Sequence, residues 1–296
     1  MPPMEKQEMA KQQEISNCRT GLYAGLTASV LFGIMAVATR RSTSDIPATE
    51  LLFIRSASSI LAVVVLQPGS IRSVASGAST LGWLRSLFSA VAALFFVLNI
   101  QDSSPTTATL FQQLTPCLVM MLAWLLSIDE LRKIHLMAAA LATFGGLLID
   151  PSSATVPNWV VTSRGLVGAL AGAASLLTLR MASSKMTGLD VLLSLTVGQL
   201  FLSLCFFGRD WRFPPTNSLG SVAVVCVTYF LGNVLLAKSF RETTATVATT
   251  IALTSAIWTG ILDHSVARQI PHASTVAAYG LILAAALLSG WPRGRD

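Results

Sequence analysis

The chain contains 296 residues, of which 53% are apolar and only 11% are charged. A soluble domain usually carries about 25% charged residues, and the mean hydropathy of +0.65 likewise favours an integral membrane protein. The net charge of +6 does not indicate a nucleic-acid-binding protein, because the Lys and Arg residues stand singly or in pairs between apolar segments.

Ten apolar stretches of about membrane-spanning length follow one another along the chain. They cover residues 21–39, 49–67, 81–100, 106–127, 135–149, 163–182, 190–208, 219–238, 244–263 and 272–291. The longest link, 151–162, separates a first half (21–150) from a second half (163–291). If the halves are repeats, five spans in each place them in opposite orientations. The predicted fold is therefore an all-α membrane protein with ten transmembrane helices in two inverted five-helix repeats.

Both ends of the chain are predicted to lie in the cytoplasm. Residues 1–20 are polar and carry both signs of charge, whereas a secretory signal has a short apolar core after a basic start. Residues 292–296 form the other tail. Placing the N-terminus inside also puts most of the 20 Lys and Arg residues on the cytoplasmic side, as the positive-inside rule requires.

The fourth stretch, 106–127, contains a proline and two glutamines at membrane depth. Pro116 removes a backbone hydrogen bond, so it predicts either a hinge for alternating access or a fixed kink filled by Thr115. Gln112 and Gln113 are adjacent, so they point about 100° apart on a helix and only one faces a cavity well. These amides are candidate substrate-binding groups, because polar groups at this depth need protein, water or substrate as partners.

Arg55 lies near the middle of the second stretch. An arginine cannot lose its proton, so a guanidinium at this depth needs carbonyl groups or an anion. Arg55 is therefore expected either to contact a carboxylate or phosphate of the substrate or to clamp the carbonyls of a neighbouring helix. Arg85 and Arg180 stand near the inner ends of their stretches, from where their side chains can extend to the interface.

Further polar and aromatic residues near span centres are candidates for binding substrate. They are Ser89, Phe96 and Asn99 in the third stretch, Gln199 in the seventh, Tyr229 and Asn233 in the eighth, and Thr250, Thr254 and Trp258 in the ninth. Residues four apart share one face of a helix, so the last three offer two hydroxyls and an aromatic wall. The alternative is that the Ser and Thr hydroxyls bond back to their own helices.

Several chemistries have no support in the sequence. The cysteines and histidines show no metal-ligand spacing, and no GxxxxGK[ST] loop is present. We therefore expect no metal, no cofactor and no direct use of ATP. No Asp or Glu lies near the centre of a stretch, so proton coupling through a buried carboxylate is not indicated.

Four short motifs of the first half resemble the EamA branch of the drug/metabolite transporter superfamily. They are Asp45-Ile46-Pro47, Phe53-Ile54-Arg55, Leu114-Thr115-Pro116 and Asp129-Glu130-Leu131. In the second half, Leu253-Thr254-Ser255 stands at the matching place, with Ser255 instead of the proline. The resemblance implies a ten-helix inverted-repeat carrier with a central cavity in a bacterial inner (plasma) membrane. It also leads us to expect that the fourth helix bends more than the ninth.

The favoured function is a secondary transporter, an exporter of a small polar or amphipathic metabolite. The resemblance favours an amino acid or an amino-acid-derived compound such as a metallophore, and a nucleotide-sugar, vitamin or drug is the alternative substrate. A membrane-embedded transferase would need acidic or His motifs, and an assembly protein would not need polar groups at depth on several helices. The expected partners are a small-molecule substrate and the lipid bilayer, not nucleic acid, and a homodimer is left open.

Overall fold

A computed structural model describes most of the chain, namely residues 3–43, 45–71, 80–102, 111, 114–128, 133–148, 159–183, 187–205, 214–267 and 273–289. Within these ranges the secondary structure is helical and contains no strand, so the predicted all-α class is confirmed. The helices are α1 (Pro3–Ser42), α2 (Ala48–Leu66), α4 (Thr80–Asp102), α6 (Thr115–Leu125), α7 (Lys133–Leu148), α8 (Trp159–Ser183), α9 (Gly188–Cys205), α10 (Leu219–Glu242), α11 (Ala245–Ala252), α12 (Ser255–Ala267) and α13 (Ala273–Ser289).

The apolar helices form a bundle whose outside is itself apolar. Five segments of the described chain are long and apolar enough to cross a membrane: Cys18–Ser42, Thr49–Leu66, Trp159–Ala182, Gly188–Cys205 and Leu219–Glu242. Large apolar side chains also lie on the surface, where Trp159 is 79% and Phe201 69% exposed. A soluble protein rarely exposes so much apolar surface in one region. The arrangement is that of a multi-pass membrane protein.

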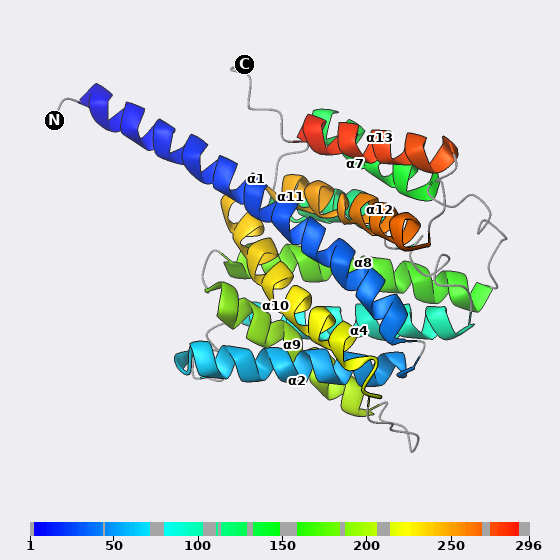
Figure 1. The fold of residues 1–296 in the computed structure, drawn as a ribbon. Coiled ribbons are helices and arrows are strands. Elements are labelled where there is room, and N and C mark those ends of the chain that lie inside the picture. The colour runs from blue at the N-terminus through cyan, green and yellow to red at the C-terminus, as the bar shows by residue number, and fades with distance from the viewer. Residues whose placement is uncertain are drawn as a thin grey trace.

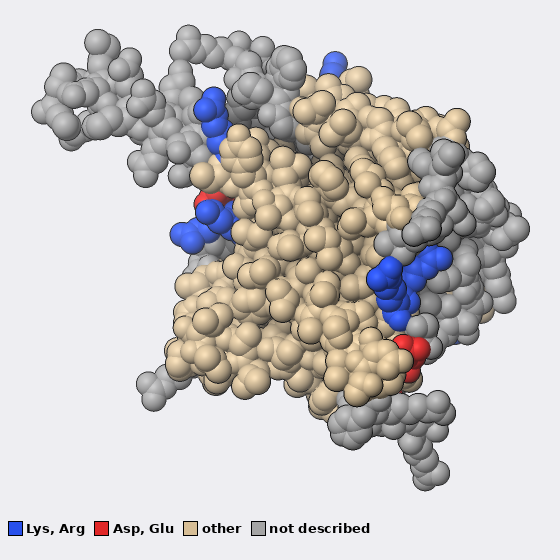
Figure 2. All heavy atoms as spheres, in the orientation of Figure 1, with Lys and Arg blue, Asp and Glu red and all other residues tan. Residues whose placement is uncertain are grey.

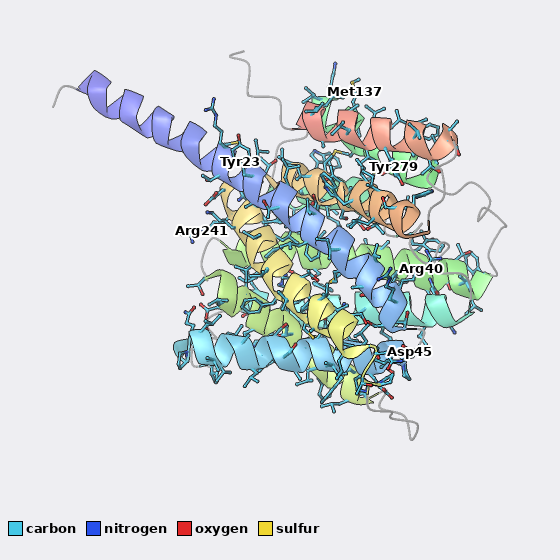
Figure 3. All side chains as sticks on the ribbon, viewed as in Figure 1. Tyr23, Arg40, Asp45, Met137, Arg241 and Tyr279 are labelled. Atoms are coloured by element: carbon cyan, nitrogen blue, oxygen red, sulfur yellow. The ribbon has the colours of Figure 1, made fainter. Side chains whose placement is uncertain are left out.

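Charged side chains lie at the edges of this surface. Figure 2 shows Lys, Arg, Asp and Glu around the margin of one face, with a broad uncharged area between them. Figure 3 places Arg241 at one edge and Arg40 and Asp45 at the opposite edge. An uncharged band between two charged rims is what a bilayer core between two aqueous interfaces requires.

Helix α1 joins the N-terminal tail to the first apolar stretch without a break. It runs for 40 residues from Pro3 to Ser42, or about 60 Å, which is twice the thickness of a bilayer core. Its N-terminal part projects beyond the other helices in Figure 1. The predicted polar tail is therefore helical over residues 3–20, and it continues the axis of the first span.

The start of α6 corrects the prediction for the fourth stretch. The described helix begins at Thr115, with Pro116 in its first turn. The backbone N–H of Leu114 donates to the carbonyl of Phe111 at 3.2 Å, forming a turn before the helix. A proline in the first turn interrupts no hydrogen bond within its helix. Pro116 is thus not at the middle of the described helix, and the remainder of the stretch, 106–110 with Gln112 and Gln113, lies outside the described residues.

The ninth stretch is not one helix but two. Helix α11 ends at Ala252 and α12 begins at Ser255. Between them the N–H of Thr254 donates to Ile251 O at 2.9 Å, and that of Ala256 donates to Leu253 O at 3.0 Å. These bonds span three residues instead of four, so the helix tightens here without a proline. This interruption was not predicted, because Ser255 stands where the first half has Pro116.

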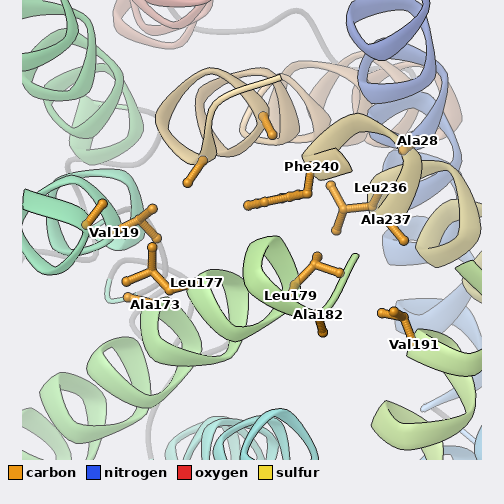
Figure 4. Close-up of a cluster of buried hydrophobic side chains, with 13 residues drawn as sticks. Ala28, Val119, Ala173, Leu177, Leu179, Ala182, Val191, Leu236, Ala237 and Phe240 are labelled. Carbon is orange, nitrogen blue, oxygen red and sulfur yellow. The ribbon is translucent and has the colours of Figure 1, made fainter. Parts of the chain in front are cut away.

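The core joins helices from both halves of the chain. Its main cluster includes Val119 of α6, Leu177 of α8, and Phe240 and Leu236 of α10, as Figure 4 shows. Arg180, on α8, is part of the same contact region: its Nη1 donates to the carbonyl oxygens of Phe240 and, at 3.0 Å, of Arg241. Arg180 therefore binds the C-terminal carbonyls of α10 instead of merely extending to the interface.

Candidate functional site

Helix α9 lies at the centre of the candidate site. It packs against α2, α4 and α10, and its buried residues include the run 190–196 together with Gln199 and Ser203. A helix buried on nearly all sides keeps polar side chains only where other groups satisfy them. The hydroxyls of Ser194, Thr196 and Ser203 donate to carbonyls of α9 itself, whereas Gln199 bonds to neighbouring helices.

Gln199 connects these four helices through its amide. Its Oε1 accepts hydrogen bonds from Arg55 Nη2 on α2 at 3.2 Å and from the Tyr229 hydroxyl on α10 at 3.0 Å. Its Nε2 donates to Ser89 Oγ on α4 at 2.9 Å. The four residues come from both halves of the chain and lie far apart in sequence. We call this group, Arg55, Ser89, Gln199 and Tyr229, the polar cluster.

Arg55 also stacks on an aromatic ring. Its guanidinium carbon lies 4.6 Å from the centroid of the Tyr229 ring, within the range of a cation–π interaction. Arg55 Nε is buried without a hydrogen-bond partner. Tyr229 and Gln199 thus hold the guanidinium in place while leaving donor capacity unused.

A second arginine lies beside the polar cluster. Arg85, on α4, is only 3% exposed, and its Nε and Nη1 are buried without hydrogen-bond partners. Both Arg55 and Arg85 interact electrostatically with Tyr229. The prediction that Arg85 extends to the interface is therefore wrong. The sequence does contain a signal for its true position, since Arg85 precedes Ser89 by four residues and shares its helix face.

The described part of the chain places no negative charge beside these two arginines. Among the described residues no carboxylate pairs with Arg55 or Arg85, and no group of three His, Cys, Asp or Glu residues is placed to hold a metal ion. The region offers two cations, a phenol, an amide and a hydroxyl. Such donors bind carboxylates and phosphates, with charge-assisted hydrogen bonds as the strongest contacts.

Two predicted amides serve the scaffold instead of the cluster. Asn99 is 1% exposed, and its Nδ2 donates to Val161 O at 3.2 Å, which ties α4 to α8. Asn233 Nδ2 donates to Tyr229 O at 2.9 Å, within its own helix. Phe96, on α4, is half-buried. Asn233 thus contacts the polar cluster through the backbone carbonyl of Tyr229 and not through a side chain of the cluster.

The residues predicted on the ninth stretch differ in exposure. Thr250 and Thr254 are 0% and 3% exposed, whereas Trp258 is 38% exposed. Thr254 donates to Ser29 Oγ on α1 at 2.8 Å and to Ile251 O at 2.7 Å. Trp258 also lies against α1, because a Cβ atom at Gly33 would be 2.6 Å from Trp258 Cβ. Substrate binding by these residues stays a prediction.

A surface hollow lies on α7, away from the four helices of the cluster. It has a volume of about 330 Å³ and is lined by Met137, Ala140, Leu141 and Phe144. All four side chains are apolar, so the hollow fits the acyl part of a lipid better than a polar metabolite.

Sequence comparison decides the family. The sequence profile of the EamA-like transporter family matches residues 19–149 and again residues 163–291. The chain belongs to the EamA-like transporter family. The resemblance deduced from the short motifs is confirmed, and the family and its members are transporters, not enzymes. Transport by an EamA-like protein implies a small-molecule substrate and a membrane location.

Individual relatives of this EamA-like transporter are distant but align over nearly the whole chain. An uncharacterized transporter of Helicobacter pylori (strain J99) is 22% identical over 277 residues, which are 90% of this chain and 93% of the relative. The pseudopaline exporter CntI of Pseudomonas aeruginosa (strain PAO1) is 18% identical over 270 residues, or 91% and 95% of the two chains. A solved crystal structure of a protein 17% identical in sequence covers 92% of this chain and 96% of its own, with a TM-score of 0.74, which shows the same fold.

The EamA-like bundle brings α4 and α9 very close at Gly198, and this contact sets the position of Gln199. A Cβ atom at Gly198 would lie 2.2 Å from Ser86 Oγ and 2.6 Å from Ser86 O. Gly198→Ala is therefore expected to separate the two helices and to break the Gln199–Ser89 bond. We expect a loss of about 1–3 kcal/mol in stability and a large loss of transport, measured as the apparent melting temperature in detergent and as substrate efflux.

Gly172→Ala is the matched control for this substitution. A Cβ at Gly172, also within an apolar helix, would meet Ala92 Cβ at 4.0 Å, an ordinary contact. This variant should behave as the wild type or be slightly stabilised, because Ala favours a helix over Gly by about 1 kcal/mol. Equal effects of the two substitutions would contradict a specific role for the close approach at Gly198.

Proposed function

We propose that this EamA-like transporter is a secondary carrier that exports a small polar or amphipathic metabolite by alternating access. The polar cluster carries the proposal. Arg55, Ser89, Gln199 and Tyr229 meet between four packed helices, α2, α4, α9 and α10. Buried polar groups at membrane depth mark substrate pathways in transporters, and a site formed between two halves of a carrier opens to alternate sides when the halves rock.

The proposed architecture is ten transmembrane helices in two inverted repeats, 21–150 and 163–291, joined by 151–162. Two observations support it. The family profile matches the chain twice, at 19–149 and 163–291. In addition, the turn before Thr115 and the turn at Thr254 interrupt the chain at matching places in the two halves. Interrupted helices at corresponding positions are a recurring feature of inverted-repeat carriers.

The proposed substrate is an amino acid or an amino-acid-derived compound, such as a metallophore. A carboxylate satisfies Arg55, while the Tyr229 hydroxyl and the Gln199 amide accommodate neutral polar groups. One relative is named a pseudopaline exporter, which supports the outward direction. A nucleotide-sugar is the second candidate, because its phosphates are also anionic and the region holds two arginines.

We further propose a bacterial inner membrane with both termini in the cytoplasm, residues 1–20 and 292–296 forming the tails. The distribution of Lys and Arg supports this orientation. In Figure 3, Arg241 marks the edge proposed as cytoplasmic, and Arg40 and Asp45 mark the opposite edge. A homodimer is compatible with this arrangement and is not required by it.

Metabolite profiling of the growth medium tests the function directly. Cells that produce the wild-type protein are compared with cells that produce equal amounts of Arg55→Ala protein in the membrane. We expect one metabolite, or a small group of related ones, to accumulate outside only with the wild type. Identical media from the two strains would contradict export through the polar cluster.

Pro116 is proposed as a hinge residue at the start of α6. Helix α6 packs against α11, so the two interrupted segments touch each other within the bundle. Pro116→Ala removes a residue that fixes the first turn, and it should reduce turnover by about twofold to fivefold. Substrate affinity should stay unchanged, because the polar cluster lies on other helices.

Initial rates of counterflow at several substrate concentrations separate turnover from affinity. Pro68→Ala is the control, since Pro68 is exposed in the turn after α2. Unchanged turnover in Pro116→Ala, or the same decrease in both variants, would argue against a hinge at this position.

A further inference from the structure

Arg85 is a buried cation with unused hydrogen-bond donors among the described residues. It is 3% exposed, and its Nε and Nη1 make no hydrogen bond. Leaving a charged group buried and unpaired destabilises a protein by several kcal/mol. Arg55 adds a third unpartnered buried nitrogen, its Nε, in the same region. Two buried guanidinium groups thus act on one tyrosine, and each carries unused donors.

A purely structural role for Arg85 would require carbonyl acceptors. Arg180 is an example of such a structural arginine in the same protein. Its Nη1 donates to the carbonyl oxygens of Phe240 and Arg241 at the end of α10. Among the described residues, Nε and Nη1 of Arg85 have no such acceptor, and no carboxylate pairs with this side chain. The guanidinium therefore has donor groups available for an anion from outside the chain.

The position of Arg85 connects it to the polar cluster. It lies on α4 one helical turn before Ser89, which accepts from Gln199, and it interacts electrostatically with Tyr229. Arg55 reaches the same tyrosine from α2. Two guanidinium groups from two helices thus approach the region of Tyr229. Each has the planar donor geometry that fits one carboxylate or phosphate group.

We propose that Arg85 is a second cationic substrate-binding residue, so that the site selects substrates with two negative charges over those with one. The inference rests on the proposed carrier function and specifies its substrate class. A single carboxylate neutralises only one of the two arginines. A ligand with two negative charges can neutralise both. The substrate groups that carry two negative charges are a pair of carboxylates or a phosphate monoester.

Binding to the purified full-length protein in detergent tests the proposal without relying on transport. The apparent melting temperature is measured against pairs of compounds that differ in one anionic group: succinate and succinamate, glutamate and glutamine, phosphoserine and serine. Sodium chloride keeps the ionic strength equal. We expect the more anionic member of at least one pair to stabilise the wild type at a concentration about tenfold lower. The first two pairs report on carboxylates, and the third reports on phosphate.

Variants at Arg85 assign the effect to this residue. Arg85→Gln should bind both members of the responsive pair within about twofold of each other, because the second charge contact is lost. Arg85→Lys keeps the charge without the planar fork, so its preference should fall between those of the wild type and Arg85→Gln. This second variant also reports on the site if Arg85→Gln does not fold. Equal binding of both members of every pair by the wild type would overturn the proposal. An undiminished preference for the more anionic member in Arg85→Gln would also overturn it. If Arg85→Gln does not fold, an undiminished preference in Arg85→Lys has the same meaning.

The outcome is separable from that of the carrier proposal. If profiling of the medium identifies an exported metabolite that is neutral or positively charged, the carrier function stands and the two-arginine site is wrong. If dianions bind through Arg85 but no metabolite is exported, the site stands and the proposed export is wrong.

Discussion

Arg55→Ala is expected to reduce transport about a hundredfold while folded protein remains in the membrane. A charge-assisted hydrogen bond contributes about 1.5–3 kcal/mol. A loss near the upper end of this range lowers the transport rate at limiting substrate concentration about a hundredfold. The fold should tolerate the change, because Arg55 contributes only one hydrogen bond, to Gln199, and the stacking on Tyr229. Efflux of the identified metabolite from liposomes measures the effect.

Arg55→Lys is the informative companion variant. A lysine keeps the charge but cannot place a planar guanidinium over the tyrosine ring or bind a carboxylate in bidentate fashion. We expect intermediate transport. If Arg55→Ala instead removes the protein from the membrane, the alternative considered for this residue holds, and Arg55 is a structural clamp.

Gln199→Leu is expected to have the largest effect on both stability and transport. The substitution removes an acceptor shared by Arg55 and Tyr229 and the donor to Ser89. Each buried polar group left without a partner costs about 1–3 kcal/mol. We therefore expect a decrease of about 2–5 kcal/mol in stability and a loss of most transport. The apparent melting temperature in detergent and the efflux rate are the two readouts.

Asn233→Leu is a matched control for the Gln199 variant. Both residues are buried amides, 8% and 6% exposed respectively, and they lie on neighbouring helices. Asn233 makes its hydrogen bond to Tyr229 O within its own helix, so its loss should cost about 1 kcal/mol or less. Equal effects of the two substitutions would show that the amide of Gln199 has no special role as a connection between helices.

Gln199→Glu separates the role of the amide from the role of charge. A glutamate still accepts from Arg55 and Tyr229, but it brings a carboxylate of the protein to the guanidinium. Transport of an anionic substrate should fall although the fold persists. The introduced carboxylate would occupy the Arg55 guanidinium in place of the anionic group of the substrate. Unimpaired transport by this variant would argue against an anion at Arg55.

Much of the polar cluster is predictable from the sequence, and the reason is energetic. Arg55, Ser89, Gln199 and Tyr229 each lie near the centre of an apolar stretch, where a polar group needs a partner. The sequence does not show which of these groups meet one another. Asn99 and Asn233 satisfy the same criterion equally well, but one binds a backbone carbonyl of α8 and the other a carbonyl of its own helix. Only the packing of the helices distinguishes these cases.

Two of the departures from prediction have physical causes as well. Arg85 lies close enough to the end of its stretch to reach an interface, and only the direction of its face on α4 turns it inward. The interruption of the ninth stretch contains neither Pro nor Gly. At this interruption the backbone forms short-range hydrogen bonds, and the Thr254 side chain bonds to Ser29 on α1. Thr254 and Ser29 are 225 positions apart in the sequence. A pattern of neighbouring residues carries no signal for such a bond.

The central claim is that the polar cluster binds a substrate that the protein carries across the membrane. Its most direct test is efflux from liposomes that contain the purified protein and are loaded with a metabolite extract of the host cells. Wild-type liposomes should lose one anionic metabolite or a related group of them, and liposomes with equal amounts of Arg55→Ala protein should retain these compounds. If both kinds of liposome lose the same metabolites at the same rate, or neither loses any, the account is contradicted.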